Sequence, residues 1–476
     1  MKQLIFHTFA YNAEATLPRT IDSVLGQTRS DWLWHLVDNG STDSTGEIIR
    51  EAARRDGRVI ALANKVNHVW EPGNSWWDIA WKYEENDCFC MLDADDEYKP
   101  EFAERMLAFM EAGSLDIAAC GFDFIDAPTG KMFSKRVAAS QLIIEGSEYA
   151  KHFSQCYKFM RAMWCKLYRM SVLRKYDFSR AGKHLVYGGD TQITIECFRN
   201  AGRVGILDES LHRYYVYPKS VSTTWDDRRV EADVTLDDMA RDFLVAKCGE
   251  VSKENDEFLL GVYFSAIRDT LEVLLGAQLP AEAMTGALHG IFTSGNTCRL
   301  IAWQGRSEEK KEIFDCAAQL LLLLLDGAEP GLAALGVEVL AAMYPGREHP
   351  LLDNMSPGLT ALVPAAVCFV MCGRYAEALE RFLAESEGAE IDDADAEAYI
   401  RFGQNLAAAA EDIGVYVYFR KIWVSYLLDN SRFDEAAGEL DELEGILPGD
   451  EEVSDLRRDL EKRFMHEPWT KVPPSS

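Results

Sequence analysis

Strand-like and helix-like segments alternate over the first half of this 476-residue chain. Short apolar runs predict buried strands, and the stretches between them have the three- and four-residue spacing of amphipathic helices. The predicted strands are residues 3–8, 32–37, 58–63, 88–92 and 115–124, and the predicted helices are residues 17–25, 44–55, 75–83 and 101–110. Such alternation is typical of an α/β fold in which helices cover both faces of a mostly parallel sheet.

The second half of the chain lacks this alternation. After about residue 235, apolar residues recur at helical spacing to the end, which predicts an all-α region. Residues 373–379 and 431–437 resemble each other, and each follows one apolar helix and begins another. Such turns are typical of tetratricopeptide repeats, whose period is about 34 residues. The larger separation here fits either degenerate repeats with a further helix over residues 394–410 or plain helical hairpins.

We therefore expect four parts: an α/β domain over residues 1–230, a helical domain over 231–355, tetratricopeptide-like hairpins over 356–466 and a flexible tail over 467–476. Charge separates the halves as well. Residues 1–235 hold 29 basic and 34 acidic residues, a balance of −5, whereas the remainder holds 20 and 44, a balance of −24. The total of −29 argues against nucleic acid as a partner, because its phosphate backbone is itself strongly negative.

Cysteine usage and hydropathy indicate where such a chain resides. The sequence has 11 cysteines and no C-x-x-C motif, which favours free buried thiols in a reducing compartment over disulfides or a zinc site. The start of the chain lacks a signal-peptide pattern, and the apolar block near residues 320–325 is too short for a transmembrane segment. We predict a cytoplasmic protein, and peripheral attachment at the inner membrane face stays open.

Three carboxylates within four residues, Asp93, Asp95 and Asp96, follow the fourth predicted strand. Their mutual repulsion costs stability unless a cation lies among them. Mg²⁺ and Mn²⁺ suit such a site, since they accept carboxylate and phosphate oxygens as ligands. The alternative is a solvated acidic turn in which Asp96 and Glu97 interact with the dipole of the next helix. By itself the segment leaves both interpretations open.

Two more polar clusters follow predicted strands, Tyr11-Asn12 after the first and Asp38-Asn39 after the second. Ligands of parallel α/β sheets bind outside the carboxyl ends of the strands, so these clusters and the acidic segment should meet at one edge. Alternatives remain for each cluster. Asp38-Asn39 also fits a turn before a helix cap, and the Tyr11 ring fits either stacking on a base or filling the core.

The combination resembles the family 2 glycosyltransferases with the GT-A fold, a Rossmann-like α/β architecture. The matching segments are H-T-F-A-Y-N at residues 7–12, S-V-L-G-Q-T at 23–28, L-V-D-N-G-S-T-D at 36–43 and L-D-A-D-D-E-Y-K-P at 92–100. Two later segments also match, W-C-K-L-Y at 164–168 and G-G-D at 188–190. In the family, the latter motif opens a helix and carries the catalytic base. The resemblance covers about residues 3–225.

The resemblance implies an inverting transfer of a sugar from a nucleotide-sugar donor, for which we expect a UDP-sugar. The acceptor would be a glycan, a lipid-linked sugar or a protein, as in polysaccharide biosynthesis. Asp190 would be the general base, and Asp95 with Asp93 would hold Mn²⁺ or Mg²⁺ in a D-x-D motif. The residues that the resemblance assigns to the nucleotide sugar are Phe9, Tyr11, Asp38, Asn39, Asp93 and Ala94.

Several positions depart from the family pattern. Asn39 replaces an acid, Gly73 replaces an arginine, and Gly189 replaces a glutamate. Tyr217 stands where the family often has a metal-binding histidine, with His212 a few residues away. Weaker candidates for the site are therefore His212, Tyr217 and Trp164. These departures bear on the sugar and the base more than on the reaction class.

Two other functions were weighed. A sugar nucleotidyltransferase needs a glycine-rich basic loop after the first strand, and residues 9–17 contain neither glycine nor a basic residue. A catalytically decayed transferase domain could serve as a nucleotide-sugar-binding or protein-interaction scaffold. The joint presence of Asp93, Asp95 and Asp190 argues against decay. The substitutions at Asn39, Gly73 and Tyr217 favour it. In either case the helical region offers a surface for a protein partner or for self-association.

Overall fold

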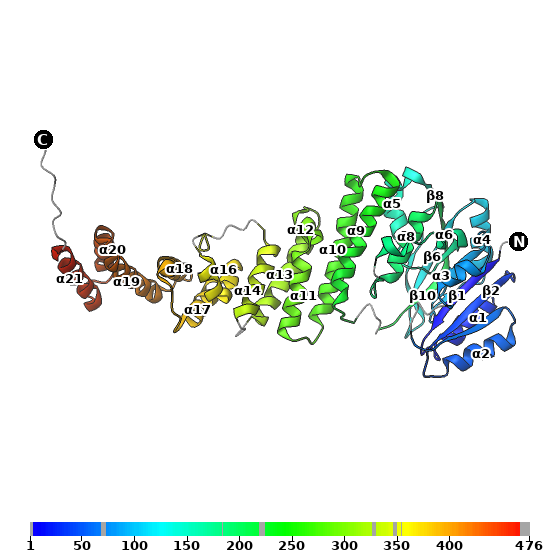
Figure 1. The fold of residues 1–476 in the computed structure, drawn as a ribbon, viewed down its shortest axis with the longest axis horizontal. Helices are drawn as coiled ribbons and strands as arrows, with labels where there is room; N and C mark the ends of the chain where they lie inside the picture. Colours follow the sequence, from blue (N-terminus) through cyan, green and yellow to red (C-terminus); the bar gives the residue numbers. More distant parts are fainter. Residues whose placement is uncertain are drawn as a thin grey trace. The chain divides into compact units, whose positions relative to one another are not determined.

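A computed structural model describes residues 3–67, 73–182, 184–218, 224–325, 330–345, 350–353 and 355–466. The predicted flexible tail, residues 467–476, lies outside the described residues. The chain divides into two compact units, Met1–Ala277 and Gln278–Ser476 (Figure 1).

The first part of unit 1 has the predicted alternation of strands and helices. Strands β1 to β4 pair in parallel in the order β3-β2-β1-β4. Their bounds are β1 (Leu4–Ala10), β2 (Trp32–Asn39), β3 (Val59–Asn64) and β4 (Cys88–Met91). The connecting helices are α1 (Leu17–Leu25), α2 (Thr45–Arg55) and α3 (Trp76–Lys82). Every carboxyl end of these strands therefore points to the same edge, as the sequence predicted.

Six further strands complete a mixed sheet of ten. In the order β3-β2-β1-β4-β9-β6-β10-β5, the antiparallel strand β9 lies between two parallel sets, and β7 and β8 pair with β6 and β10. The bounds are β5 (Glu97–Tyr98), β6 (Ile117–Asp126), β7 (Lys131–Arg136), β8 (Leu142–Glu145), β9 (Lys166–Arg169) and β10 (Arg203–Val216). The longest ladders, β6–β10 and β1–β2, are parallel.

Helices cover both faces of this sheet. Alternate residues of β1 enter different cores: Leu4 and Phe6 pack with α1 and α2, whereas Ile5 packs on the opposite face. The remaining helices of unit 1 are α4 (Phe102–Ala112), α5 (Tyr149–Tyr157), α6 (Met170–Leu173), α7 (Phe178–Ala181), α8 (Gly189–Asn200), α9 (Arg228–Cys248) and α10 (Lys253–Leu275). A short 3₁₀ turn, η1 (Gly146–Glu148), precedes α5.

The compact α/β unit extends past the predicted limit at residue 230. Helix α9 contributes Phe243 and Leu244, and α10 contributes Leu259, to the core that covers the second face of the sheet. Their burial makes these two helices part of unit 1, which ends at Ala277. The predicted limits within the helical half, at residues 355 and 466, stay predictions.

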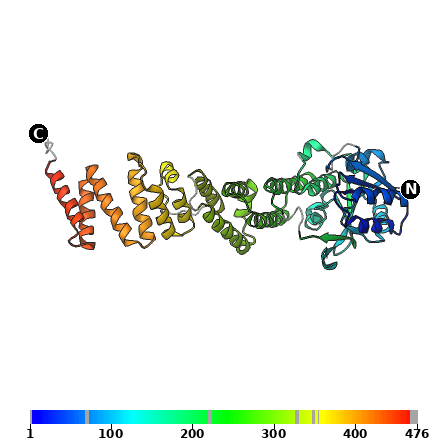
Figure 2. The same ribbon diagram turned by 90° about the horizontal axis from the view of Figure 1, so that it is seen from below.

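Helices are the regular secondary structure of unit 2 within its described residues, as predicted. Its helices are α11 (Ala281–Thr293), α12 (Gly295–Ala302), α13 (Ser307–Leu324), α14 (Pro330–Met343), α15 (Pro357–Leu362), α16 (Pro364–Met371), α17 (Tyr375–Ser386), α18 (Asp393–Ala409), α19 (Ile413–Asp429), α20 (Phe433–Ile446) and α21 (Glu451–His466). From α16 onwards, each helix packs against the next (Figure 2). The helix predicted over residues 394–410 is α18.

One turn geometry recurs between these helices. Gly373 and Ser431 both have positive φ, 74° and 56°, and the amide after each donates to a carbonyl five residues earlier. The distances are 2.9 Å for Arg374 to Phe369 and 2.8 Å for Arg432 to Leu427. The two similar sequence segments therefore form the same turn.

A third copy of the turn, with φ 59° at Glu411, precedes α19. The amide of Asp412 donates to the carbonyl of Ala407 at 2.9 Å. No residue pattern had marked this copy.

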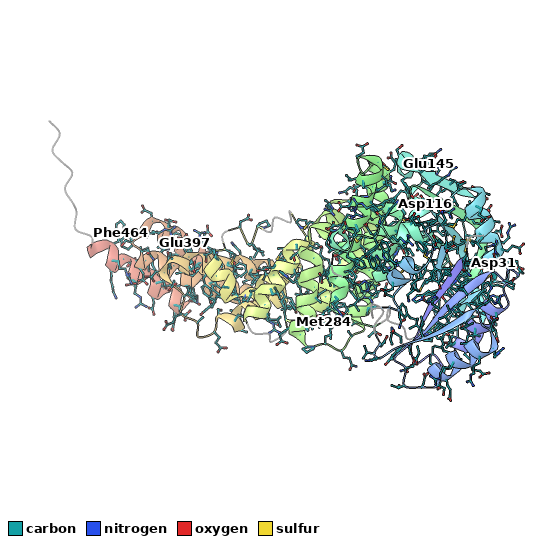
Figure 3. All side chains as sticks on the ribbon, turned by 45° about the vertical axis from the view of Figure 1, so that its right-hand side comes forward. Asp31, Asp116, Glu145, Met284, Glu397 and Phe464 are labelled. Atoms are coloured by element: carbon teal, nitrogen blue, oxygen red, sulfur yellow. The ribbon has the colours of Figure 1, made fainter. Side chains whose placement is uncertain are left out.

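Ion pairs also link the hairpins, since Glu397 of α18, labelled in Figure 3, contacts both Arg401 and Arg432.

These turns predict opposite effects for two substitutions. Gly373→Ala should destabilise the helical unit by about 1 kcal/mol, because a side chain at positive φ is strained. Ser431→Gly should stabilise it by up to about 1 kcal/mol, because glycine relieves that strain. Thermal unfolding of the full chain, followed by circular dichroism, measures both shifts. Equal signs for the two variants would contradict the shared turn geometry.

Candidate active site

The acidic segment forms a loop between β4 and β5. Carboxylate oxygens of Asp93, Asp95 and Asp96 lie within 4.8 Å of one another. Burial raises the pKa of all three groups, and the neighbouring charges raise those of Asp93 and Asp96 further. Such a cluster favours a bound cation, because a divalent ion with oxygen ligands would remove the repulsion. The donor set therefore fits the predicted Mg²⁺ or Mn²⁺.

Helix α1 and the residue before it hold this loop in place through two threonines. The hydroxyl groups of Thr16 and Thr20 both donate to the carbonyl oxygen of Ala94 at 3.0 Å. Thr20 also donates to the carbonyl oxygen of Asp96 at 2.9 Å. The sequence assigned Ala94 to the nucleotide sugar. Its side chain is nearly buried, and its carbonyl group anchors the loop through these hydrogen bonds.

Both carboxylate oxygens of Asp96 form hydrogen bonds inside the protein. Its Oδ1 accepts from the amide of Tyr215 at 2.9 Å, and its Oδ2 lies 2.9 Å from Nε2 of His212. Both Asp96 and His212 are almost completely buried. Asp93 and Asp95, in contrast, are partly exposed. These two carboxylates, which were the predicted metal ligands, are therefore the ones that remain open to a ligand.

His212 stacks on Trp164, with ring centroids 4.8 Å apart and planes 7° from parallel. Burial lowers the pKa of His212 to about 3, so the ring is neutral at physiological pH. Its Nε2 is engaged by Asp96, so binding a metal through that nitrogen would require His212 to break this hydrogen bond. In the described structure, His212 and Trp164 support the acidic loop.

Arg19 of α1 is a cation that the motif analysis did not single out. Its Nη2 donates to the carbonyl of Asp95 and, at 3.3 Å, to the hydroxyl of Tyr217. Its guanidinium lies 3.5 Å above the ring of Tyr215. Tyr217 is thus linked to Asp95 through Arg19. The signal for this residue was indirect: glycine stands at position 73 where the family pattern has an arginine, so that cation is either missing or supplied from elsewhere in the chain.

Asp190 lies in the first turn of α8, with its side chain exposed to solvent. Desolvation by the surrounding protein nevertheless raises the pKa of Asp190, whereas the positive charge of Lys166 lowers it. The charge of Asp190 in turn raises the pKa of Asp93, next in importance after burial. Asp190 and the acidic loop are therefore within electrostatic reach of each other.

Residues 161–164 bring these distant parts of the chain together. Trp164 forms an isolated parallel bridge with Met91 at the end of β4. On the other side, Thr191 donates to the carbonyl of Arg161 at 2.8 Å. This short segment thus connects the strand before the acidic loop to the helix turn that carries Asp190.

Glycine at positions 188 and 189 is explained by close packing. Gly188 has a φ of 73°, and a Cβ there would lie 2.7 Å from Leu236. A Cβ on Gly189 would lie 2.6 Å from the ring of His184. The glutamate that the family pattern expects at 189 is therefore sterically incompatible with His184 in this arrangement.

The predicted nucleoside residues differ in how open they are. Tyr11 is 47% exposed just beyond β1, and Asp38, which is partly exposed, pairs in register with Ala10. Asn39 is buried: its oxygen accepts from Asn64 and its amide donates to Asn67, both at 2.8 Å.

The other two predicted contacts are also partly used by the fold. Phe9 is half-buried, and its ring lies edge-on to His7, with centroids 4.6 Å apart. Asp38 accepts from the amide of Ser41 at 2.9 Å, and its other oxygen lies where a Cβ on Gly46 would be. Among the predicted nucleoside residues at the ends of β1 and β2, Tyr11 is therefore the most exposed, and Phe9 and Asp38 are partly exposed.

Comparison with known proteins shows what the N-terminal region is similar to. Residues 7–177 match the family model described as Glycosyl transferase family 2. The uncharacterized glycosyltransferase EpsJ of Bacillus subtilis is 29% identical over 215 residues, which cover 44% of this chain and 60% of that protein. The uncharacterized glycosyltransferase YibD of Escherichia coli is 26% identical over 218 residues, covering 44% and 61%. The chain thus spans about three fifths of the length of these relatives.

Solved structures give a weaker likeness. Residues 1–349 of S. aureus TarS, in complex with UDP-GlcNAc, align with 81% of this chain and 91% of that one at 15% identity and a TM-score of 0.40. The mannosyltransferase PcManGT of Pyrobaculum calidifontis, in complex with GDP-Man and Mn²⁺, covers 63% and 85% at 12% identity and a TM-score of 0.37.

Fold and site together define the class of protein. It is an α/β domain with an acidic loop at the carboxyl edge of its parallel strands. The N-terminal region of the chain carries a glycosyltransferase family 2 domain, as the sequence motifs predicted. Within the described residues, no helix is long and apolar enough to cross a membrane. All 11 cysteines are free thiols, as predicted, but only seven are buried: Cys248 and Cys372 are partly exposed, and Cys298 and Cys316 are exposed.

The buried pair below the loop gives a stability prediction. His212→Ala should destabilise unit 1 by about 3 kcal/mol, because it leaves a cavity and an unsatisfied buried carboxyl group on Asp96. Tyr217→Phe removes only the hydrogen bond between Arg19 and the Tyr217 hydroxyl, so it should lower the free energy of unfolding by less than about 1 kcal/mol. Urea unfolding of the full chain, followed by fluorescence, compares the two. A His212→Ala effect no larger than that of Tyr217→Phe would show that the pair does not support the loop.

Proposed function

We propose that the N-terminal unit is a metal-dependent, inverting glycosyltransferase that moves a sugar from a nucleotide-sugar donor, a UDP-sugar, to a glycan, lipid-linked or protein acceptor. One observation carries the proposal. Two open carboxylates, Asp93 and Asp95, follow strand β4 of a family 2 domain, and residues 161–164 connect that strand to the helix turn that carries a third carboxylate, Asp190.

Asp93 and Asp95 would hold Mn²⁺ or Mg²⁺, which would neutralise the charge that the leaving nucleoside diphosphate gains. The protein's part is to keep both carboxylates in place. The Thr16 and Thr20 hydroxyls fix the loop backbone from α1, and Arg19 fixes the carbonyl of Asp95. Arg19 acts here as a positioning residue.

Asp190 would accept the proton of the attacking acceptor hydroxyl. Its side chain is exposed, so an acceptor can reach it, and partial desolvation by the surrounding protein raises its pKa towards the range in which a carboxylate takes up a proton. The acceptor oxygen would attack the anomeric carbon as the bond to the diphosphate breaks. Attack from the face opposite the leaving group inverts the configuration.

Tyr11 and Asp38 would bind the nucleoside, by stacking on the base and by hydrogen bonds to the ribose or base. Both have accessible surface beside the acidic loop. We propose a smaller part for Asn39, whose amide group already bonds to Asn64 and Asn67. It would shape the floor beneath the base.

For the helical unit we propose a tetratricopeptide-like array that binds a protein partner or a second copy of the chain. The repeated turns at Gly373, Glu411 and Ser431 support this proposal. We further propose a cytoplasmic enzyme of polysaccharide biosynthesis, acting at or near the inner membrane face.

A scaffold that binds nucleotide sugars without turnover is the second candidate. It is favoured by the commitment of His212 to Asp96 and by the loss of the family histidine at Tyr217, since both reduce the ligands available to a metal. Binding without release of nucleoside diphosphate would support it.

A donor screen tests the main proposal. The full chain is incubated with each common nucleotide sugar and Mn²⁺ or Mg²⁺, and release of nucleoside diphosphate is followed with and without simple acceptors. Release should require the metal and should be abolished by a chelator. Asp95→Asn should lower it at least about 100-fold, because the leaving charge is no longer neutralised.

Asp190→Asn separates base catalysis from donor binding. It should lower transfer by about 10² to 10⁴-fold while donor affinity changes little, because general-base catalysis contributes that range. Asp208→Asn, which removes an exposed carboxylate of β10, is the control and should behave as wild type. Full transfer by Asp190→Asn would exclude the base assignment, and metal-independent release would exclude the metal.

A further inference from the structure

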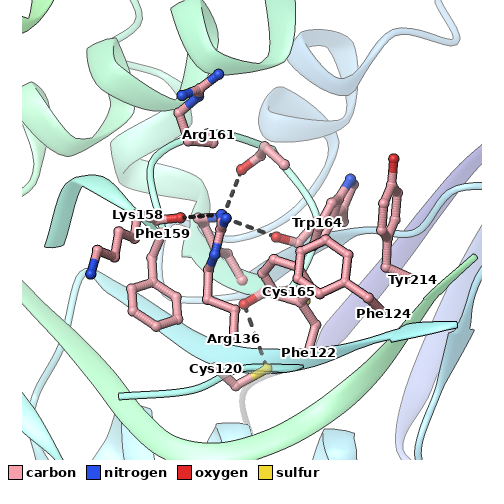
Figure 4. A pocket seen from close by; sticks show the side chains of 12 residues that line it. Cys120, Phe122, Phe124, Arg136, Lys158, Phe159, Arg161, Trp164, Cys165 and Tyr214 are labelled. Carbon is pink, nitrogen blue, oxygen red and sulfur yellow. Dashed lines mark hydrogen bonds between the residues drawn. The ribbon is translucent and has the colours of Figure 1, made fainter. Parts of the chain in front are cut away.

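Unit 1 contains a cavity of about 150 Å³ that the proposed donor site does not use. Figure 4 shows it between strand β6, residues 158–166 and strand β10. Aromatic rings form much of its wall: Phe122, Phe124, Phe159, Trp164 and Tyr214.

The charge of this cavity is the opposite of the charge of the chain. Its lining includes Arg136, Lys158, Arg161 and Lys166 and no carboxylate, in a protein whose net charge is −29. Within the described part of the chain, no carboxylate pairs with Arg136, Lys158 or Arg161 within 4.0 Å. Other half-buried arginines are paired, for example Arg241 with Asp237.

Arg136 is held without a counter-charge. Its guanidinium lies 5.3 Å from the ring centroid of Phe122 and 5.7 Å from that of Phe124, and its Nη1 donates to the carbonyl of Lys158 at 3.2 Å. Burial and the neighbouring charge of Arg161 both lower the pKa of Arg136. Arg136 is half-buried, whereas Arg161 is exposed and its charge also acts on the buried Asp233. Two repelling guanidinium groups at a cavity wall favour a bound anion, and the effect is largest for Arg136, because desolvating a charge without a counter-charge is costly.

Lys166 has a different part. Its ammonium group donates to the carbonyls of Ala162 at 2.6 Å and Trp164 at 3.0 Å. It therefore fixes the segment that separates the cavity from α8. Its charge also acts on Asp190, whose pKa it lowers.

The cavity adjoins the proposed catalytic groups. Trp164 lines it and stacks on Tyr214, with centroids 5.1 Å apart. Tyr214 also lines it, and the carboxylates of the acidic loop raise the pKa of its hydroxyl, after the larger effect of burial. The carbonyl of Arg161 accepts from Thr191, the neighbour of Asp190.

The strand order places the cavity and the proposed nucleoside residues on opposite sides of the acidic loop. Tyr11 and Asp38 follow β1 and β2, on one side of β4 and its acidic loop. The cavity is formed by β6, β7 and β10, on the other side of β4. A nucleotide bound by Tyr11 and Asp38 therefore lies away from Arg136.

We propose that this cavity is the acceptor subsite and that it selects an acceptor sugar bearing an anionic group, a phosphate or a carboxylate. Arg136 and Arg161 would bind the anion, since a guanidinium fork matches both groups, and the aromatic wall would pack against the sugar. The inference rests on the proposed function, because it requires Asp190 to deprotonate the same acceptor.

Binding to the full chain tests the subsite without turnover. Calorimetric titrations compare glucose 6-phosphate and glucuronic acid with uncharged glucose and with inorganic phosphate. At least one of the two charged sugars should bind at least tenfold more tightly than either glucose or phosphate, and the stronger of the two identifies the anionic group. Equal binding of glucose, or binding of phosphate as tight as that of both charged sugars, would overturn the proposal.

Variants test the residues. Arg136→Gln and Arg161→Gln should each remove most of the preference for the charged sugar. Lys135→Gln, which removes an exposed charge from the same strand without lining the cavity, should keep it. Circular dichroism establishes that each variant is folded, and two separate arginines guard against the failure of one. Unchanged preference in both arginine variants would overturn the proposal.

Donor hydrolysis to water distinguishes this proposal from the previous one. The arginine variants should release nucleoside diphosphate in water at the wild-type rate, and a parallel loss of donor binding would instead assign the cavity to the donor and overturn the proposal. Absence of turnover in wild type, with charged sugars still bound through Arg136 and Arg161, would remove the acceptor role and the transferase function while leaving an anionic-sugar site.

Discussion

Repulsion among carboxylates at the end of β4 is the constraint on which the account depends. Asp93, Asp95 and Asp96 lie within 4.8 Å of one another, and Asp190 adds a fourth negative charge. The fold keeps them together by committing Asp96 to His212 and the backbone, while α1 holds the loop. Asp93 and Asp95 are then the carboxylates of the loop that remain open to a ligand, and their repulsion favours a divalent cation.

The structure divides the edge of the sheet by charge. Carboxylates gather after β4, the proposed nucleoside residues Tyr11 and Asp38 lie at the ends of β1 and β2, and guanidinium groups line a cavity at β6 and β7. The segment at residues 161–164 joins the acidic and cationic parts, because it bridges to β4 and bonds to α8. A sugar transfer needs such a division, since donor phosphates and acceptor hydroxyl must approach from different sides.

The sequence predicted local structure well and long-range pairing poorly. Helix α1 has the predicted bounds, 17–25, and strands β1 to β4 fall within two residues of the predicted ones, because each has clear apolar periodicity and breaking residues. The strands β8 and β9 were not predicted, and each pairs with a strand far away in the sequence. The bond between His212 and Asp96 spans 116 residues, and no local pattern indicates it. Arg19 was missed for the same reason: its role exists only where α1 meets the acidic loop.

The most direct test of the central claim is a crystal structure of the full chain with Mn²⁺ and UDP, with data collected for anomalous scattering. The account predicts an anomalous peak bound by Asp93 or Asp95 and by the diphosphate, with Asp190 facing the same site. A manganese ion bound elsewhere, or UDP held with no ion near these carboxylates, would contradict it.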